Sequence, residues 1–217
     1  MFKGIMGILA GACALAGPAA AQQPQPEMQQ IRAAVLRVDS PGLPPISRLD
    51  LPPADLGFAG ARLAIDDNDT TGRFMGQDFE ALEITATPET AAAEMDRILA
   101  DGIQFVVVLA DDATTLALSD QAGDRAMLLN ARARGDALRG ADCRFNTIHV
   151  APSHAMLADA LAQFLMWKNW PDWLLVHGSH PEDQALAAAY RRSAAKFGAT
   201  IVEERVFTDT GGASDHV

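Results

Sequence analysis

The chain has 217 residues, of which 28 are Asp or Glu and 17 are Lys or Arg, so its formal net charge at pH 7 is -11. Such an acidic chain lacks the basic face that nucleic-acid phosphates require, which excludes nucleic acid as a partner. With 49% hydrophobic and 21% charged residues, the composition is that of a globular protein and excludes a disordered or collagen-like chain. The length suffices for one full domain, or for one and a half.

The first 21 residues have the pattern of a secretory signal peptide. Lys3 supplies a positive start, residues 4–16 are apolar and small, and residues 19–21 (AAA) offer a cleavage site before Gln22. We therefore expect export to the periplasm and a mature chain that begins near Gln22. An anchor helix is the alternative, but the apolar run is shorter than the roughly 20 residues that span a bilayer.

The two cysteines lead to separate expectations. Cys13 lies within the signal peptide and follows a weak match to the lipobox of bacterial lipoproteins, so lipid anchoring at Cys13 stays open as the less favoured alternative. Cys143 is the single cysteine of the expected mature chain and has no partner for an internal disulfide. We expect its thiol to be buried and inert.

Residues 22–30 are polar and contain proline, which predicts a tether. From Ile31 onward, short apolar runs alternate with longer segments of helical period, and this alternation is typical of βαβ units with a parallel sheet. The predicted strands lie at 31–38, 82–86, 103–110, 126–130, 147–151, 173–177 and 200–207.

Capping residues mark the ends of three predicted helices between these strands. Thr87 and Pro88 are expected to begin the first helix, at its N-cap and its first position. Ser153 is expected to cap the second. Pro181 is expected to begin the third, which Gly198 ends.

The order of these elements predicts an α/β fold with a doubly wound parallel sheet over residues 31–151. Such domains bind ligands outside the carboxyl ends of their strands, where the strand order reverses. Residues 152–217 have the pattern of a second lobe that begins with helix, strand, helix and strand. Residues 209–217 add only a Gly-bearing turn, which would leave a half-sheet with an uncovered edge. We therefore expect a truncated chain with an incomplete second lobe.

Three stretches resemble a known family of receptors. Residues 56–77 (LGFAGARLAIDDNDTTGRFMGQ) resemble the first helix and turn of the extracytoplasmic solute receptors of ABC importers, in the leucine/isoleucine/valine-binding class. Residues 145–165 (FNTIHVAPSHAMLADALAQFL) resemble the crossing between the two lobes of that fold, and residues 173–202 match the family further. More narrowly, the chain is similar to the receptors associated with pyrroloquinoline quinone (PQQ) dependent alcohol dehydrogenase systems.

This resemblance implies the first lobe of a bilobed type I periplasmic binding protein plus an incomplete second lobe. It also implies a small-molecule solute and an ABC permease in the inner membrane as partners, with no cofactor. Within the first stretch, Gly60 and Ala64 are expected to allow close approach of the helix to the sheet. Asn68 and Gly72 are expected to adopt left-handed conformations in the following turn.

The resemblance also places a ligand site in the loops after the third and fourth strands. Amino-acid-binding members hold the ligand there with Ser and Thr hydroxyls and backbone amides, but this chain lacks the Ser-rich pattern. The corresponding positions are occupied by Asp112, Thr114, Asn130 and Arg132, which are therefore the predicted ligand-binding residues of the first lobe. Thr114 has an alternative role as a helix cap, and Asp112 as a partner of the same helix dipole.

A guanidinium at the lip of a cleft suits a carboxylate. If Arg132, or less favourably Arg134, contacts the ligand, the solute is anionic or carries several carboxylates, and PQQ fits that chemistry. Both arginines are otherwise simply solvated.

In the second lobe, amino-acid receptors commonly have a Tyr-Gly pair after the strand, whereas residues 177–183 of this chain read HGSHPED. His180 of this run completes the predicted ligand-binding set. The spacing of His177 and His180, followed by Glu182 and Asp183, is also compatible with a metal cluster. The two acidic residues are however favoured anyway in the first turn of a helix, so no metal site is expected.

Two classes of function remain. The first is a binding protein without catalysis that serves an ABC importer. The alternative is an accessory protein that binds or senses a cofactor for a PQQ-dependent alcohol dehydrogenase system without transport. An enzyme is disfavoured, because the sequence contains no G-x-S-x-G elbow, no phosphate-binding loop after the first strand and no convincing metal set.

Overall fold

The computed structural model describes residues 28–39, 47, 49 and 51–207. The predicted signal peptide with Cys13, residues 22–27 of the predicted tether and residues 208–217 lie outside this part. Among the described residues, no helix has both the length and the apolar character needed to cross a bilayer.

Five parallel strands form the sheet of the first unit, in the order β2-β1-β3-β4-β5. They are β1 (Gln29–Val38), β2 (Gln77–Ala86), β3 (Phe105–Leu109), β4 (Met127–Asn130) and β5 (Thr147–His149). This order confirms the predicted doubly wound sheet. The order reverses between β1 and β3, the point at which ligands bind in folds of this kind. Strand β1 already includes Gln29 and Gln30, which the sequence had assigned to the tether.

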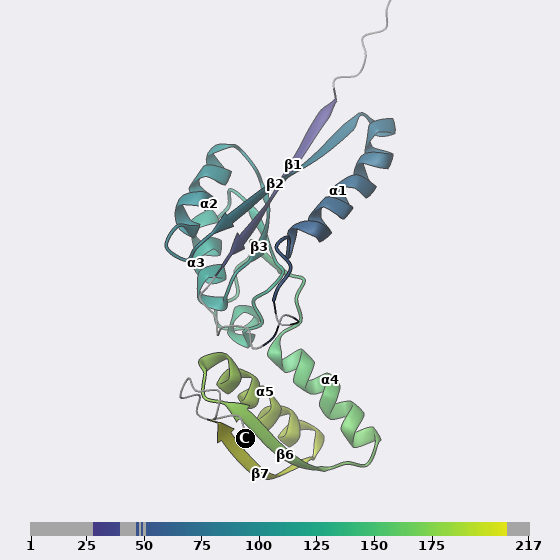
Figure 1. Cartoon of the computed structure of the whole chain (residues 1–217), viewed down its shortest axis with the longest axis vertical. Coiled ribbons are helices and arrows are strands. Elements are labelled where there is room, and N and C mark those ends of the chain that lie inside the picture. Colours follow the sequence, from purple (N-terminus) through teal and green to yellow (C-terminus); the bar gives the residue numbers. More distant parts are fainter. Residues whose placement is uncertain (1–27, 40–46, 48, 50, 208–217) are drawn as a thin grey trace, which may run out of the picture.

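Helices cover both faces of this sheet (Figure 1). They are α1 (Phe58–Gly72) on one face, and α2 (Ala91–Ala100) and α3 (Asp112–Ala122) on the other, with short 3-10 helices η2 (Arg73–Met75) and η3 (Asp136–Arg139). The main core lies between the sheet and α2 and α3, where Leu36, Met95, Val108 and Leu128 have no exposed surface.

A second, smaller unit follows. It consists of α4 (His154–Trp167), β6 (Asp172–Gly178), α5 (Pro181–Phe197) and β7 (Thr200–Phe207). Strands β6 and β7 pair in parallel as a separate two-stranded sheet, and α4 leads from the first unit into the second (Figure 1). Helix α4 packs on α5 through small buried residues such as Ala158, Ala162 and Ala194.

The predicted helix ends are confirmed in the second unit and wrong at α2. The Ser153 hydroxyl accepts a hydrogen bond from the Met156 N–H at 3.3 Å, Pro181 is the first residue of α5, and Gly198 ends α5 with φ 79°. Helix α2 however begins at Ala91, three residues later than predicted. The intervening residues form a turn in which the Thr87 N–H donates to the Thr90 hydroxyl at 2.9 Å.

Two expectations for the stretch 56–77 are also wrong. Close approaches occur at Gly57, where a Cβ would lie 2.5 Å from the Leu109 side chain, and at Gly72, where it would lie 2.7 Å from the Phe79 ring. A Cβ at Gly60 would meet no atom within 4 Å. The left-handed residue is Gly76, with φ 73°, because η2 extends the helical path beyond Gly72. Asn68 lies within α1, and its side chain donates to the Ala64 carbonyl at 2.7 Å.

Cys143 is exposed, which contradicts the expected buried thiol. It lies in the connection between η3 and β5. Connections of this kind run over the surface, since their backbone polar groups need solvent.

The burial of the core predicts unequal effects of two methionine substitutions. Met95→Ala should lower the free energy of unfolding by about 2–5 kcal/mol, because the Met95 side chain is fully buried and its loss leaves a cavity. Met156→Ala, on the surface of α4 at 55% exposure, should change it by less than about 0.5 kcal/mol. Chemical denaturation of both variants measures the difference, and equal losses would contradict this placement of the core.

Candidate functional site

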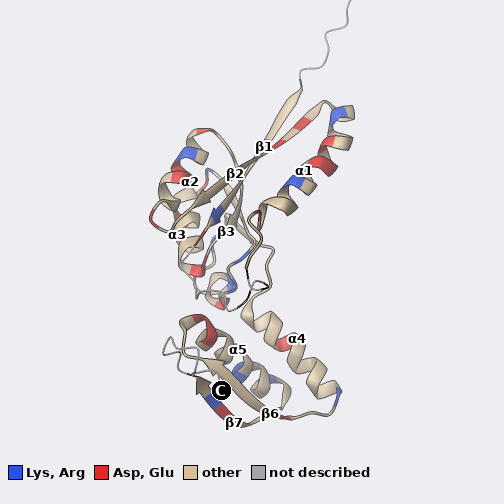
Figure 2. Cartoon of the chain, in the orientation of Figure 1, with Lys and Arg blue, Asp and Glu red and all other residues tan. Residues whose placement is uncertain are grey.

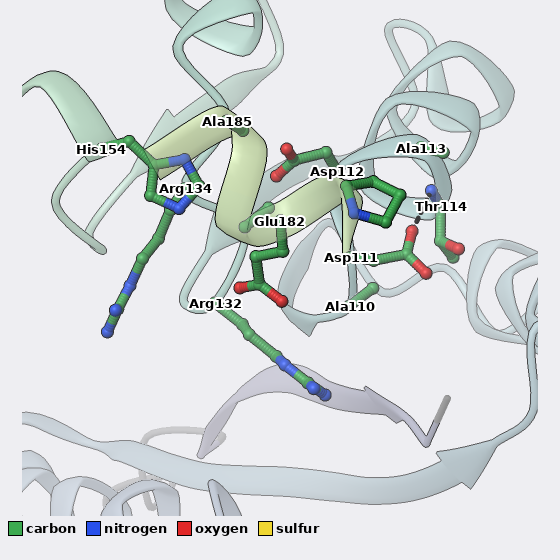
Figure 3. A pocket seen from close by; sticks show the side chains of 12 residues that line it. Ala110, Asp111, Asp112, Ala113, Thr114, Arg132, Arg134, His154, Glu182 and Ala185 are labelled. Atoms are coloured by element: carbon green, nitrogen blue, oxygen red, sulfur yellow. Dashed lines mark hydrogen bonds between the residues drawn. The ribbon is translucent and has the colours of Figure 1, made fainter. Parts of the chain in front are cut away.

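A cavity of about 370 Å³ lies between the two units. The loops after β3 and β4 form one side of it, and the starts of α4 and α5 form the other. Figure 3 shows the lining side chains, with the first turn of α5 crossing the cavity between His154 on one side and Asp111 and Thr114 on the other. The lining residues are Ala110, Asp111, Asp112, Ala113, Thr114, Arg132, Ala133, Arg134, His154, Pro181, Glu182 and Ala185.

The start of α3 brings two of the predicted residues, Asp112 and Thr114, into this cavity. The cap of α3 is Asp111 and not Thr114, because the Asp111 carboxylate accepts a hydrogen bond from the Thr114 N–H at 2.7 Å. Asp112 Oδ1 accepts from the Gly135 N–H at 2.9 Å, which ties the start of α3 to the loop after β4. Both aspartates therefore have structural partners besides facing the cavity.

Asn130, another predicted ligand-binding residue, is fully buried at the end of β4 and does not line the cavity. Its Oδ1 accepts hydrogen bonds from the N–H groups of Arg132, at 3.1 Å, and Ala133, at 2.8 Å. Its Nδ2 donates to the Ala133 carbonyl at 2.8 Å and lies 2.9 Å from His149 Nδ1. In the structure Asn130 therefore shapes the loop that carries Arg132.

The tautomer of His149 follows from its partners. His149 Nε2 lies 3.1 Å from the Leu138 carbonyl oxygen, which can only accept, so Nε2 carries the hydrogen and Nδ1 accepts from Asn130. Burial lowers the pKa of His149, with a further lowering by the charge of Arg139. A neutral ring is what this pair of hydrogen bonds requires.

Arg132 and Arg134 extend from the loop after β4 as exposed side chains. Among the described residues, neither guanidinium has a carboxylate partner or a hydrogen bond. Arg132 also lines a neighbouring cavity of about 410 Å³ together with Arg37, Asp39 and Leu56, at the carboxyl end of β1. Arg132 thus lies next to the reversal of strand order, where the fold predicts a ligand.

From the second unit, the start of α5 contributes Pro181, Glu182 and Ala185. His180, the last predicted ligand-binding residue, occupies the N-cap position of α5 directly before Pro181 and is not among the residues that line the cavity. His154 and Glu182 also line the cavity, although the sequence did not predict them there. The available signal was the position of His154 directly after the capping Ser153, where the chain crosses from one unit to the next.

His177 makes hydrogen bonds within the second unit. Its Nδ1 lies 2.8 Å from the Gly178 carbonyl oxygen and its Nε2 lies 3.0 Å from Glu204 Oε1, so both nitrogens face acceptors. The Glu204 carboxylate raises the pKa of His177, helped by the Gly178 carbonyl. Arg191 and then His177 lower the pKa of Glu204 to about 2. Within the described part of the chain, no group of three or more His, Cys, Asp or Glu residues is arranged to hold a metal ion.

Comparison with known families gives one match. A model of the family described as periplasmic binding protein matches residues 54–217. A search of curated proteins found no significant match.

Solved structures show similar folds. A branched-chain amino acid ABC transporter periplasmic ligand-binding protein from Burkholderia xenovorans is 19% identical with a TM-score of 0.69, over 83% of this chain and 47% of that protein. An ABC transporter substrate-binding protein from Desulfitobacterium hafniense, in complex with Leu, is 18% identical with a TM-score of 0.67, over 85% and 52%. An ABC transporter solute binding protein from R. palustris, in complex with benzoate, is 12% identical with a TM-score of 0.60, over 83% and 49%. The chain therefore spans about half the length of these proteins.

The interactions of His177 with Glu204 and of Glu204 with Arg191 predict a pH-dependent contribution to the free energy of unfolding. Because the folded pKa of His177 is raised above 6.5, its contribution is complete below that pH and is lost as the pH rises through the folded pKa. Because the pKa of Glu204 is lowered from 4.5 to about 2, its contribution is present above pH 4.5 and is lost as the pH falls toward 2. The two contributions coincide between pH 4.5 and 6.5.

We therefore expect His177→Gln to destabilise the chain more at about pH 5.5 than at about pH 8.5, as measured by urea unfolding at both values. Glu203→Gln is the control, since Glu203 pairs with Arg205 on the exposed surface of the same strand. Its effect should be equal at the two pH values. If His177→Gln lowered the free energy of unfolding equally at both pH values, the pKa of His177 would not be raised in the folded protein.

Proposed function

The chain belongs to the periplasmic binding protein family, and from that premise we propose that it is the solute receptor of an ABC importer. Its α/β architecture is that of the type I periplasmic binding fold, as the three matching stretches of sequence implied. In this proposal the protein is exported to the periplasm, binds a small carboxylate-bearing solute between its two units and delivers it to a permease in the inner membrane. It does not transform the solute.

The observation that carries the proposal is the Arg132 guanidinium at the edge of the cavity. Other arginines of the chain, such as Arg62 and Arg144, pair with carboxylates of the protein itself. Arg132 and Arg134 both line the cavity without such a partner among the described residues, and of the two only Arg132 also lines the neighbouring cavity at the carboxyl end of β1. A guanidinium in that position is suited to bind a carboxylate of a solute through two parallel hydrogen bonds.

The similar proteins support a carboxylate as the shared feature of the solute. The Desulfitobacterium hafniense protein was solved with leucine and the R. palustris protein with benzoate. These two ligands differ in their side groups, but both carry a carboxylate. A site that begins with Arg132 is compatible with either, and also with a solute that has several carboxylates.

PQQ remains our candidate for a solute with several carboxylates, on the basis of the narrower sequence resemblance and the position of Arg132. No feature of the described residues favours the alternative of an accessory protein without a transport partner. We therefore retain the importer receptor as the proposed function.

Calorimetric titration tests this proposal. We expect PQQ to bind more tightly than leucine, and Arg132→Gln to weaken PQQ binding about tenfold or more, because a charge-assisted hydrogen bond is lost. Arg97→Gln is the matched control, since Arg97 lies on α2 and pairs with Glu94 of the same helix. Tighter binding of leucine than of PQQ would contradict a multi-carboxylate solute. Unchanged PQQ binding by Arg132→Gln would contradict the role of Arg132.

A further inference from the structure

His154 is a buried imidazole at the boundary between the two units. It is the first residue of α4, only 5% of its surface is exposed, and it lines the cavity (Figure 3). Its backbone is fixed on both sides: the His154 N–H donates to the Arg134 carbonyl at 2.9 Å, and the preceding Ser153 caps the helix. The position of the ring is therefore set by the start of a helix and not by a loose loop.

The His154 ring has no hydrogen bond to any described residue. The fully buried side-chain atoms that lack a hydrogen-bond partner in that part of the chain belong to other residues. The ring nitrogens of His154 are therefore accessible, and the cavity is the space that they can reach. A neutral imidazole offers one donor and one acceptor there.

The other buried or partly buried histidines of the described chain differ from His154 in this respect. His149 uses both ring nitrogens, toward Asn130 and the Leu138 carbonyl. His177 also uses both, toward Gly178 and Glu204. Folded proteins generally satisfy buried polar groups, since leaving them unpaired is unfavourable. The ring nitrogens of His154 instead open onto the cavity, where a bound molecule can supply their partner.

Charged side chains from three segments lie near His154, but none of them forms a hydrogen bond with its ring. The Asp136 carboxylate, on η3, lies near His154, yet its oxygens bond to the Ala155 N–H at 2.9 Å and to Arg192. Glu182, on α5, and Arg134, on the loop after β4, line the same cavity as His154. The cavity thus retains room for a polar group of a solute beside the imidazole.

We propose that His154 is a specificity-determining residue that hydrogen-bonds a second polar group of the solute, in addition to the carboxylate at Arg132. The substrate class is therefore carboxylic acids with a second oxygen-bearing group, such as another carboxylate, a hydroxyl or a carbonyl. This inference rests on the proposed function. An aliphatic tail in the same place would leave the buried imidazole unpaired, and sites built to hydrogen-bond a polar group discriminate strongly against analogues that lack it.

Matched pairs of acids test this inference on the full chain. The pairs are butyrate with succinate and benzoate with phthalate, and calorimetry measures the affinity ratio within each pair. For the unmodified protein, we expect the acid with the second carboxylate to bind about tenfold or more tightly than its partner in at least one pair. His154→Phe, which keeps a ring but removes both nitrogens, should bring that ratio close to one.

Two further variants separate the possible outcomes. His154→Gln should retain part of the preference, since it keeps a donor and an acceptor, and it serves as the second variant if His154→Phe does not fold. Arg132→Gln should weaken both members of each pair. A ratio near one in the unmodified protein, or a ratio that neither His154 variant changes, would overturn the role of His154 while leaving the proposed function intact. Failure of all four acids, PQQ and leucine to bind would overturn both.

Discussion

The side-chain amide of Asn130 is the interaction on which the candidate site depends. Asn130 ends β4 with no exposed surface, and its oxygen accepts two backbone N–H groups of the loop that follows. Its nitrogen donates back to that loop and to a neutral His149. Because these groups are paired and the Asn130 side chain is buried, the loop has one favoured path, and an apolar side chain of similar size would leave its N–H groups unsatisfied. That path places Arg132 at the carboxyl edge of the sheet.

The same loop then connects the two units. Gly135 donates to Asp112 at the start of α3, and the next residue, Asp136, accepts from the Ala155 N–H of α4 and pairs with Arg192 of α5. Burial alone would raise the pKa of Asp136, but these hydrogen bonds and the neighbouring positive charges outweigh it and lower the pKa. Asp136 therefore stays ionised near neutral pH and links η3 to both helices of the second unit. Polar contacts thus join the two sides of the cavity.

The sequence predicted the strands of the sheet better than the side chains that line the cavity, because strands follow from local patterns and the lining depends on tertiary contacts. Buried parallel strands such as β1, β3 and β4 are short apolar runs, which made them visible in the sequence. The caps at Ser153 and Pro181 were visible because their chemistry is local. The positions of Gly72 and of the exposed Cys143 depend instead on which surfaces meet in three dimensions.

The candidate site shows the same limit. The family resemblance implied a site with Asp112, Thr114 and Arg132, and the structure brings these three to one cavity. Asn130 occupies a buried position below them, and His180 lies beside the cavity. The importance of His154 was hidden, because an unpaired imidazole is recognised only when the partners of every neighbouring group are known.

The negative net charge of the chain bears on how an anionic solute could bind at the candidate site. Acidic residues are spread over both units, including the first turn of α5 (Figure 2), and the chain as a whole carries a net charge of -11. Such a protein does not attract anions from a distance, but at physiological ionic strength charges more than about 8 Å apart are largely screened. Selection of the proposed anionic solute would therefore depend on contacts inside the cavity, where Arg132 has no described carboxylate partner while Asp111 and Asp112 already accept backbone hydrogen bonds. Under the proposed function, a protein of net negative charge would bind a carboxylate through a guanidinium inside the cavity.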